Sequence, residues 1–190
     1  MTKSPSSSSS KSGTKTVLLG VTASIAAYKA CDLVNLFRRK GFAVKCVMTR
    51  DAEHFITPLT LETLTCAKVV TDMFLLPETR NPLHIALAEE ADIIVVAPAT
   101  ADIIGKVAAG ICDDILTCAI CATERPVLFA PAMNSKMYSN PIIRDKISYL
   151  KSKGYRFVGP IEGHLACGQR GMGHLASPEN ILKEAEKLLK

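Results

Sequence analysis

Short apolar runs alternate with stretches of helical periodicity along most of this 190-residue chain. The apolar runs predict strands at residues 17–21, 43–48, 92–98, 126–131 and 156–158. The spacing of apolar residues elsewhere predicts helices near residues 25–40, 58–65, 83–90, 101–109, 113–122, 140–153 and 178–190. Because apolar strands separated by helices are typical of a parallel sheet buried on both sides, we predict a three-layer α/β fold with helices on both faces.

The longest of the early helices, residues 25–40, carries apolar side chains at helical spacing. We expect one buried face from Ile25, Tyr28, Leu33, Leu36 and Phe37. Gly41 follows directly and is a residue type that commonly ends a helix.

The N-terminal stretch MTKSPSSSSSKSGTK is Ser-rich and almost without apolar side chains. Such a segment cannot bury enough apolar surface to order itself. We therefore expect residues 1–15 to be a disordered tail and residues 16–190 to form one domain with a sizeable core.

The charge balance argues against a nucleic-acid-binding surface. The net charge is +5, but three of the 23 basic residues lie in the tail, which leaves 20 basic and 18 acidic side chains in residues 16–190. The chain has no tryptophan on which a base could stack. No apolar run approaches the roughly 18 residues of a membrane span, and the polar N-terminus is unlike a secretory signal, so we expect a cytoplasmic protein.

Most of the seven cysteines lie in apolar helix or strand patterns, where a thiol usually packs as a small apolar group. Cys118 and Cys121 form a C-x-x-C, but no second Cys or His pair lies nearby. We interpret these two as core packing rather than as a redox or metal pair. The histidines lack ligand spacing, so no metal site is expected.

Three segments that follow predicted strands contain residues suited to binding, because ligands of parallel sheets bind at the carboxyl ends of the strands. Residues 20–29 could hold a phosphate at a helix N-terminus, or Ser24 could only cap that helix. The small residues at 97–102 would admit a flat ligand, although a tight turn explains them equally. In residues 131–138, Asn134 could bind a carboxylate or amide, and the methionines could pack on an apolar ring or fill core gaps.

A fourth segment, residues 163–173, surrounds Cys167 with four glycines. This composition predicts a mobile flap rather than a core element. The Cys167 thiol could act as a nucleophile or proton donor, or have no chemical role. His84, at the start of a predicted helix, could be catalytic or simply a surface or capping residue.

Taken in order, these segments resemble the flavin-containing cysteine decarboxylases. The matching stretches are GVTASIAAYKACDLVNLFRRKG, VMTRDAEHFITPLT, HIALAEEADIIVVAPATAD, PAMNSKMYSNP and ACGQRGMGHL. The chain is most similar to the branch that acts on phosphopantothenoylcysteine in coenzyme A biosynthesis, particularly the N-terminal half of the bacterial bifunctional protein. The PAMNSKMY block combined with the later ACG is the specific feature. The resemblance implies a flavodoxin- or Rossmann-like fold.

The resemblance also implies tightly bound FMN and a trimer-based homo-oligomer with the flavin at a subunit interface. The residues it places near the flavin phosphate are Thr22, Ala23, Ser24 and Thr49. Those it places near the rest of the flavin are Phe55, Ala97, Pro98, Ala99, Thr100, Asp102 and Met133. The implied catalytic residues are His84, Asn134 and Cys167, and the implied substrate contacts are Asn134, Met137, Ala166 and Cys167.

The implied reaction converts 4'-phosphopantothenoylcysteine to 4'-phosphopantetheine. The substrate thiol is oxidised to a thioaldehyde that accepts electrons as CO₂ leaves; hydride return and a proton from Cys167 then complete a cycle without net oxidation. The fold also accommodates peptidyl-cysteine decarboxylation and flavin prenyl transfer, which the ACG flap argues against. A non-catalytic regulatory subunit is a third alternative, which His84, Asn134 and Cys167 argue against. A phosphopantothenate–cysteine ligase, as a further domain or a separate protein, is the implied partner.

Three positions depart from the family pattern. Ala23 stands where glycine is usual, and Asp102 where asparagine is usual. His174, followed by leucine, stands where the family has arginine followed by methionine. We expect Asp102 to bring negative charge near the flavin and His174 to alter the contact with the substrate phosphate.

Overall fold

The computed structural model describes residues 13–74, 81–164 and 170–190. Its centre is a five-stranded sheet in the order β2-β1-β3-β4-β5, in which every neighbouring pair is parallel. The strands are β1 (Thr16–Val21), β2 (Ala43–Met48), β3 (Ile93–Ala99), β4 (Val127–Pro131) and β5 (Arg156–Phe157). The predicted parallel α/β sheet is confirmed.

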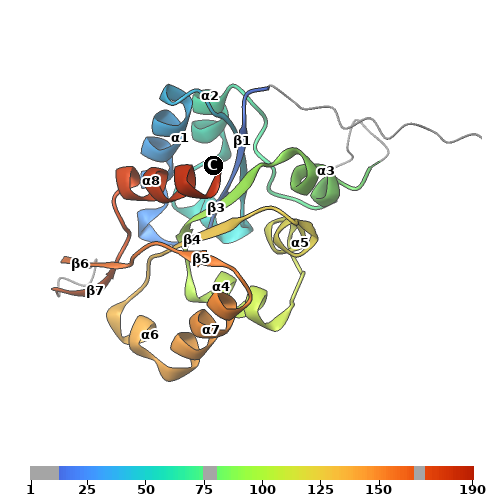
Figure 1. Cartoon of the computed structure of the whole chain (residues 1–190). Coiled ribbons are helices and arrows are strands. Elements are labelled where there is room, and N and C mark those ends of the chain that lie inside the picture. The colour runs from blue at the N-terminus through green and yellow to red at the C-terminus, as the bar shows by residue number, and fades with distance from the viewer. Residues whose placement is uncertain (1–12, 75–80, 165–169) are drawn as a thin grey trace, which may run out of the picture.

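Helices cover both faces of this sheet (Figure 1). One face packs against α1 (Ala30–Arg39), α2 (Pro58–Thr65) and α8 (Pro178–Leu188). The other face packs against α3 (Leu83–Glu90), α4 (Ala101–Ala109), α5 (Ile115–Ala122) and α7 (Pro141–Ser152). Two apolar clusters, one on each side of the sheet, lie between the sheet and its two layers of helices. This arrangement is the predicted three-layer fold.

The alternation of side chains along β1 shows how the sequence sets up two cores. Val17, Leu19 and Val21 belong to the cluster under α1 and α8, whereas Leu18 belongs to the cluster under α5. Gly20 faces α5 so closely that an added Cβ would lie 2.6 Å from Leu116 Cδ1. Side chains of successive strand residues point to opposite faces, so a strand buried on both sides is apolar throughout.

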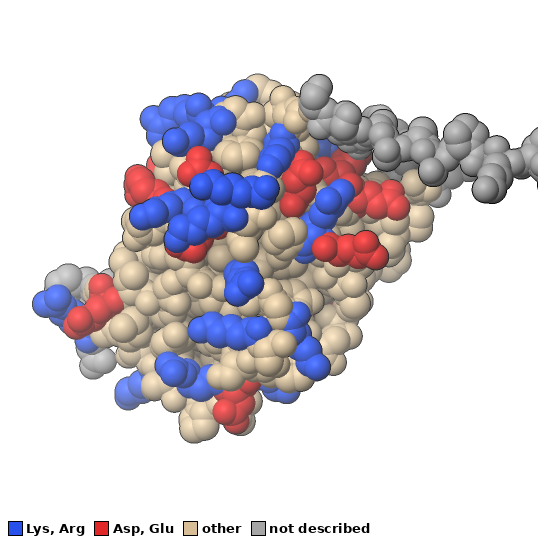
Figure 2. Space-filling model, viewed as in Figure 1, with Lys and Arg blue, Asp and Glu red and all other residues tan. Residues whose placement is uncertain are grey.

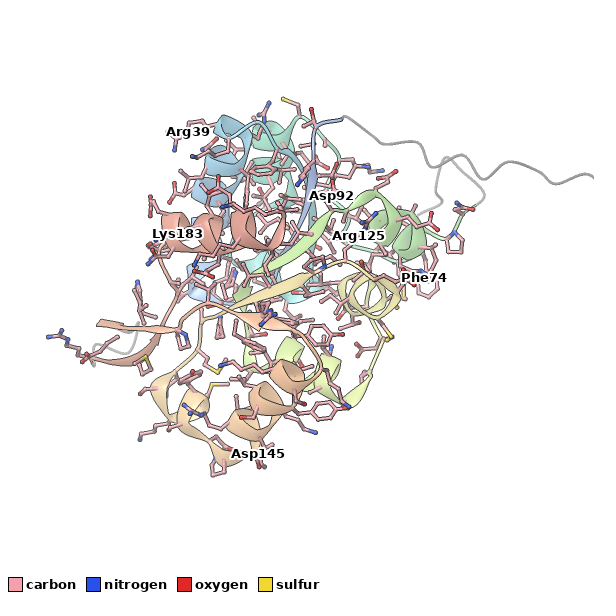
Figure 3. The ribbon with its side chains drawn as sticks, in the orientation of Figure 1. Arg39, Phe74, Asp92, Arg125, Asp145 and Lys183 are labelled. Atoms are coloured by element: carbon pink, nitrogen blue, oxygen red, sulfur yellow. The ribbon has the colours of Figure 1, made fainter. Side chains whose placement is uncertain are left out.

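The order of the strands reverses direction between β1 and β3. From β1 the chain moves outward to β2, and from β3 it moves the other way to β4 and β5. At the amino ends of β1 and β3, the carboxylate of Asp92 accepts a hydrogen bond from Thr16 N at 2.8 Å (Figure 3). A crevice therefore forms at the opposite, carboxyl ends, where such sheets bind ligands.

The predicted helix at residues 25–40 begins differently from expectation. Its first turn is a 3₁₀ helix, η1 (Ile25–Lys29), and only then does α1 follow. Because a 3₁₀ turn has three residues per turn, it rotates its side chains out of the face that α1 presents. Ile25 and Tyr28 are consequently 60% and 56% exposed, so their predicted burial is wrong, while Leu33 and Phe37 are fully buried as expected.

The sequence did not indicate three short elements: η2 (Arg50–His54), α6 (Ser135–Ser139) and a two-stranded antiparallel sheet formed by β6 (Ile161–His164) and β7 (Arg170–His174). The β6–β7 pair extends away from the body of the molecule (Figure 1). It forms the base of the predicted flap, whose tip at 165–169 lies outside the described residues. The boundary between a 1–15 tail and a 16–190 domain stays a prediction, because residues 1–12 also lie outside them.

The interpretation of the C-x-x-C as core packing is wrong. Cys121 is exposed and Cys118 is only half-buried, and Cys112 nearby is exposed as well. The buried stripe of α5 consists of other residues, including Leu116 and Ala119, so the cysteines lie toward its outer side. Cys118 Sγ lies 3.4 Å from the carbonyl oxygen of Cys112 in the loop before α5.

Basic and acidic side chains are interspersed over α1 and α8 (Figure 2). Ion pairs between them include Lys40–Glu186 and Lys187–Glu184. Among the helices that the structure describes, none combines the length and apolar character that a membrane span requires.

Candidate functional site

A cavity of about 430 Å³ opens at the carboxyl ends of the strands. Its walls come from the segments that follow β1, β2, β3 and β4, which are adjacent in the sheet although far apart in sequence. The lining residues are Thr22, Ala23, Ser24, Thr49, Arg50, Asp51, Thr100, Ala101, Asp102, Lys106, Asp114, Ala132, Met133 and Met137. A larger hollow of about 770 Å³ lies between α1 and the start of α8, away from the strand ends.

The side chain of Thr22 joins two walls of this cavity. Its hydroxyl donates to Pro98 O at 2.7 Å and accepts from Thr100 N at 3.1 Å, and the residue is 1% exposed. The hydroxyl proton is thereby used within the protein. Thr22 holds the end of β1 against the end of β3, which fixes the crevice at the point where the strand order reverses.

Two further hydroxyl residues of the cavity sit at helix starts. Ser24 Oγ accepts from Ala26 N at 3.3 Å and caps η1, which continues directly into α1. Thr100 Oγ1 accepts from Ile103 N at 3.4 Å and caps α4. Ser24 thus does cap a helix, as one of the two sequence interpretations expected. The same helix start also borders the cavity, so its N–H groups and positive dipole end lie where an anionic group can bind.

The segment after β4 forms another wall. Met133 and Met137 line the cavity, and Asn134 between them begins α6, with its side-chain oxygen accepting from Lys136 N at 2.9 Å. Asn134 is not among the lining residues, although its neighbour Met133 is. The two sulfur-bearing side chains give the cavity an adaptable apolar wall.

Gly173, at the end of the flap, contacts this same segment. Met133 N donates to Gly173 O at 3.1 Å, and a Cβ added to Gly173 would lie 2.1 Å from Met133 O. The next residue, His174, has its Nε2 3.0 Å from Lys29 Nζ of η1. The base of the flap is therefore fixed both to Met133, the residue before Asn134, and to Lys29 at the end of η1. Cys167 and Ala166 lie outside the described residues.

Several predicted site residues do not line the cavity. Ala97, Pro98 and Ala99 are strand residues of β3, and the two alanines are fully buried. Phe55 is 46% exposed just after η2, and His84 is half-buried at the start of α3. The cavity thus brings together the four residues predicted for the flavin phosphate and, from other segments, Thr100, Asp102, Met133 and Met137.

Sequence reasoning assigned no role to four charged residues of the cavity: Arg50, Asp51, Lys106 and Asp114. Two of these carried a detectable signal. Lys106 follows Asp102 by four residues on a predicted helix, a spacing that favours ion pairs. Asp114 precedes a predicted helix, where aspartate often caps. Across the described residues, no group of three or more His, Cys, Asp or Glu side chains is arranged to hold a metal ion.

The chain is similar in sequence to proteins named for coenzyme A biosynthesis and for phosphopantothenoylcysteine decarboxylation. The N-terminal part of the coenzyme A biosynthesis bifunctional protein CoaBC of Bacillus subtilis is 48% identical over 176 residues, covering 91% of this chain and 43% of that protein. A probable phosphopantothenoylcysteine decarboxylase of Streptococcus mutans is 42% identical over 178 residues, covering 93% of this chain and 99% of that protein. The chain therefore spans less than half the length of the bifunctional relatives it matches.

Solved structures agree with this result. A cysteine-to-serine variant of PPC decarboxylase complexed with pantothenoylaminoethenethiol has a TM-score of 0.82 and 32% identity, covering 92% of this chain and 98% of that one. The FMN-dependent cysteine decarboxylase SpaF has a TM-score of 0.77 and 30% identity, covering 90% and 97%. The flavoprotein family model matches residues 5–190. This match extends over nearly the whole chain, and the cavity lies where the strand order of the parallel sheet reverses, beside a capped helix start. The chain belongs to the flavoprotein family.

Proposed function

We propose that this chain binds FMN and catalyses the decarboxylation of 4'-phosphopantothenoylcysteine to 4'-phosphopantetheine. The observation that carries the proposal is the cavity, which the segments after four parallel strands enclose at the reversal of the strand order. The relatives named for this reaction, and the FMN-dependent structural neighbour, support the choice of substrate and cofactor.

The residues of the cavity fit FMN. Ala23, Ala101 and Ala132 give part of the wall little bulk, so a flat ring system can approach the backbone. Ser24 and Thr49 supply hydroxyls beside the helix start, where the phosphate of FMN would bind. When bound, FMN supplies reversible two-electron oxidation of the substrate thiol, which turns the neighbouring carbon into an acceptor for the electrons left by CO₂.

The chain's own residues would position the substrate and exclude water. Asn134 projects from the start of α6, where an amide can donate to a carboxylate and hold it beside the cavity. The described base of the flap is fixed to Met133, next to Asn134. Cys167, at the tip of the flap, would donate the proton that replaces CO₂. Closing the flap would protect a thioaldehyde from water.

We also propose that the site is completed by another copy of the chain in a homotrimer. Large apolar side chains are exposed on neighbouring segments that follow β1 and β2: Ile25, Tyr28, Phe55 and Leu59. Such a concentration of exposed apolar side chains suits an interface. Association through this surface would bring Phe55 of one copy toward the cavity of another, which is consistent with the position of Phe55 outside the cavity of its own chain. We propose that His84, at the start of α3 on the other face of the sheet, belongs to the same assembled site.

The proposed setting is the cytoplasm, with a phosphopantothenate–cysteine ligase supplying the substrate. A relative named as a bifunctional protein of coenzyme A biosynthesis is matched over 43% of its length, which leaves room in it for a second activity. No described helix suits a membrane span.

The test is a purified protein incubated with FMN and then with 4'-phosphopantothenoylcysteine. We expect flavin absorbance bands that remain after gel filtration, and CO₂ release in step with 4'-phosphopantetheine. Cys167→Ser should keep the flavin but accumulate an oxidised substrate, while Cys66→Ser, a change at an exposed cysteine in another part of the fold, should retain turnover. A colourless protein after incubation would overturn the FMN proposal. Turnover of a peptide ending in cysteine, without turnover of the phosphorylated substrate, would overturn the substrate assignment.

A further inference from the structure

Lys106 occupies an unusual position at the edge of the cavity, among three carboxylates. Its Nζ lies 3.1 Å from Asp113 Oδ1, 3.5 Å from Asp102 Oδ2 and 3.6 Å from Asp114 Oδ2. The Lys106 side chain is 25% exposed and that of Asp114 is 24% exposed. Lys106 and Asp114 are therefore partly withdrawn from water, where charges interact more strongly than on an open surface, whereas Asp102 and Asp113 are exposed.

The network connects two helices whose starts border the cavity. Asp102 lies in the first turn of α4, four residues before Lys106. Asp114 caps α5: its Oδ1 accepts from Thr117 N at 2.8 Å, and its own N–H donates to Thr117 Oγ1 at 3.1 Å. This reciprocal capping fixes Asp114 in place, so the ammonium of Lys106 links a fixed carboxylate on α5 to the carboxylate of Asp102 on α4.

The surroundings of Lys106 stabilise its charged ammonium form. Burial acts to lower the pKa of Lys106, but the hydrogen bond to Asp113 and the charges of Asp102, Asp113 and Asp114 outweigh it and raise the pKa. Lys106 thus carries the one positive charge of a group that holds three carboxylates. Without it, Asp102 and Asp114 would lose the ammonium that pairs with both of them, and Arg50 would remain as the basic residue that the described part of the chain brings to the cavity.

We propose that Lys106 is a positioning residue of the flavin site: it holds Asp102 against Asp114 and, by compensating their charge, raises the reduction potential of the flavin. The inference rests on the proposed function, because it requires FMN in this cavity. Reduction adds negative charge to a flavin, so uncompensated carboxylates nearby disfavour the reduced form and a neighbouring ammonium favours it. Substrate oxidation, the step that reduces the flavin, would become less favourable without Lys106.

The test measures the midpoint potential of FMN-loaded protein by slow enzymatic reduction against a reference dye. In Lys106→Met, which keeps the length of the side chain and removes its charge, the oxidised-to-reduced ratio at a fixed potential should rise roughly two- to fivefold, as loss of a partly exposed ion pair allows. Lys106→Arg should restore the parent potential. Lys45→Met, which breaks the exposed ion pair between β2 and Glu90 of α3, is the matched control and should leave the potential unchanged.

A double-mutant cycle separates a specific role from a general structural one. Asp102→Asn should shift the potential upward, and Lys106→Met should have a smaller effect in that background, because the carboxylate it compensates is gone. A parent-like potential in flavin-loaded Lys106→Met would overturn the inference and leave the proposed function intact. If Lys106→Met does not retain flavin, an unchanged potential in Asp102→Asn overturns it instead. A parent protein that binds no FMN overturns the proposed function and this inference together.

Discussion

At the scale of single residues, the site depends on contacts that residue type alone does not reveal. Thr22 was singled out as a flavin contact, but its hydroxyl binds Pro98 O and Thr100 N across the crevice. A threonine after a strand can cap a helix, bind a ligand or link two loops, and the choice depends on which strand lies next to its own. Only the pairing of β1 with β3 places these partners within reach.

Thr22→Val should destabilise the protein by about 1–3 kcal/mol, because the shape is kept while a buried acceptor and a buried donor lose their partner. Chemical denaturation monitored by circular dichroism measures the change. Thr60→Val, at an exposed position of α2, is the control, with a change within about 0.5 kcal/mol. Equal stability of the Thr22 variant and the parent would show that the two loops are held by other contacts.

Gly173→Ala should detach the base of the flap from the segment that carries Asn134. An added Cβ would lie 2.1 Å from Met133 O, and the backbone at Gly173 has φ +153, which other residues rarely adopt. Hydrogen exchange at the amide of Met133, which donates to Gly173 O, should become faster. Gly105→Ala, where nothing lies within 4 Å of the new Cβ, should leave that exchange rate as in the parent. Unchanged exchange in Gly173→Ala would show that the flap base does not depend on this contact.

At the scale of elements, apolar periodicity predicted the strands of the sheet and the long helices, because burial against the sheet imposes it. It failed where local geometry prevails. Ile25 and Tyr28 fit the helical period of α1 but face outward from a 3₁₀ turn. Neither β6 nor β7 contributes residues to the two main apolar clusters. Their glycine-rich sequences therefore lack the alternation of apolar and polar residues that would indicate strands. Cys118 and Cys121 lie in an apolar helix, yet on its outer side.

The loop before α5 should show an unreactive thiol in an exposed position. Although Cys112 is exposed, partial desolvation by the atoms around its thiol, then a hydrogen bond with Cys121 and nearby negative charge, raises the pKa of that thiol to about 11. Because only the thiolate reacts, iodoacetamide at pH 8 should modify exposed Cys66 before Cys112, and the Cys112 rate should rise about tenfold per pH unit until about pH 11.

Peptide mapping by mass spectrometry follows each cysteine separately. Cys46, whose pKa burial raises to about 12, serves as the reference for a protected thiol and should react only after unfolding. Reaction of Cys112 at the rate of Cys66 at pH 8 would contradict the arrangement of this loop against α5.

At the scale of the whole molecule, the sequence predicted which segments converge, because all carboxyl ends of parallel strands lie along one edge of the sheet. It therefore anticipated that Ser24, Thr49 and Asp102 line a common cavity. It did not anticipate Lys106 and Asp114, since their proximity depends on how α4 packs against α5. Phe55 and His84 do not line the cavity of their own chain, although the family resemblance implies a role for both in the flavin site.

Association of copies is the physical explanation we propose, and it makes a specific prediction about Ile25. This side chain is 60% exposed on η1, directly after Ser24 of the cavity. Burying an aspartate in an apolar interface carries a desolvation penalty of several kcal/mol. Ile25→Asp should therefore shift the protein from trimer to monomer in light scattering coupled to gel filtration, and FMN should be lost with it if the interface completes the site.

Ile142 provides the matched control, because it is the same residue type, 66% exposed, on α7. Ile142→Asp should leave both the mass and the bound flavin as in the parent. Mass and bound flavin report on association and cofactor binding separately. A monomeric Ile25→Asp variant that keeps its flavin would mean that one chain holds the cofactor alone. A trimeric Ile25→Asp variant would place the contact between copies elsewhere. Only loss of both would show that an exposed 3₁₀ turn, which breaks the helical pattern expected from the sequence, serves to join copies around a shared site.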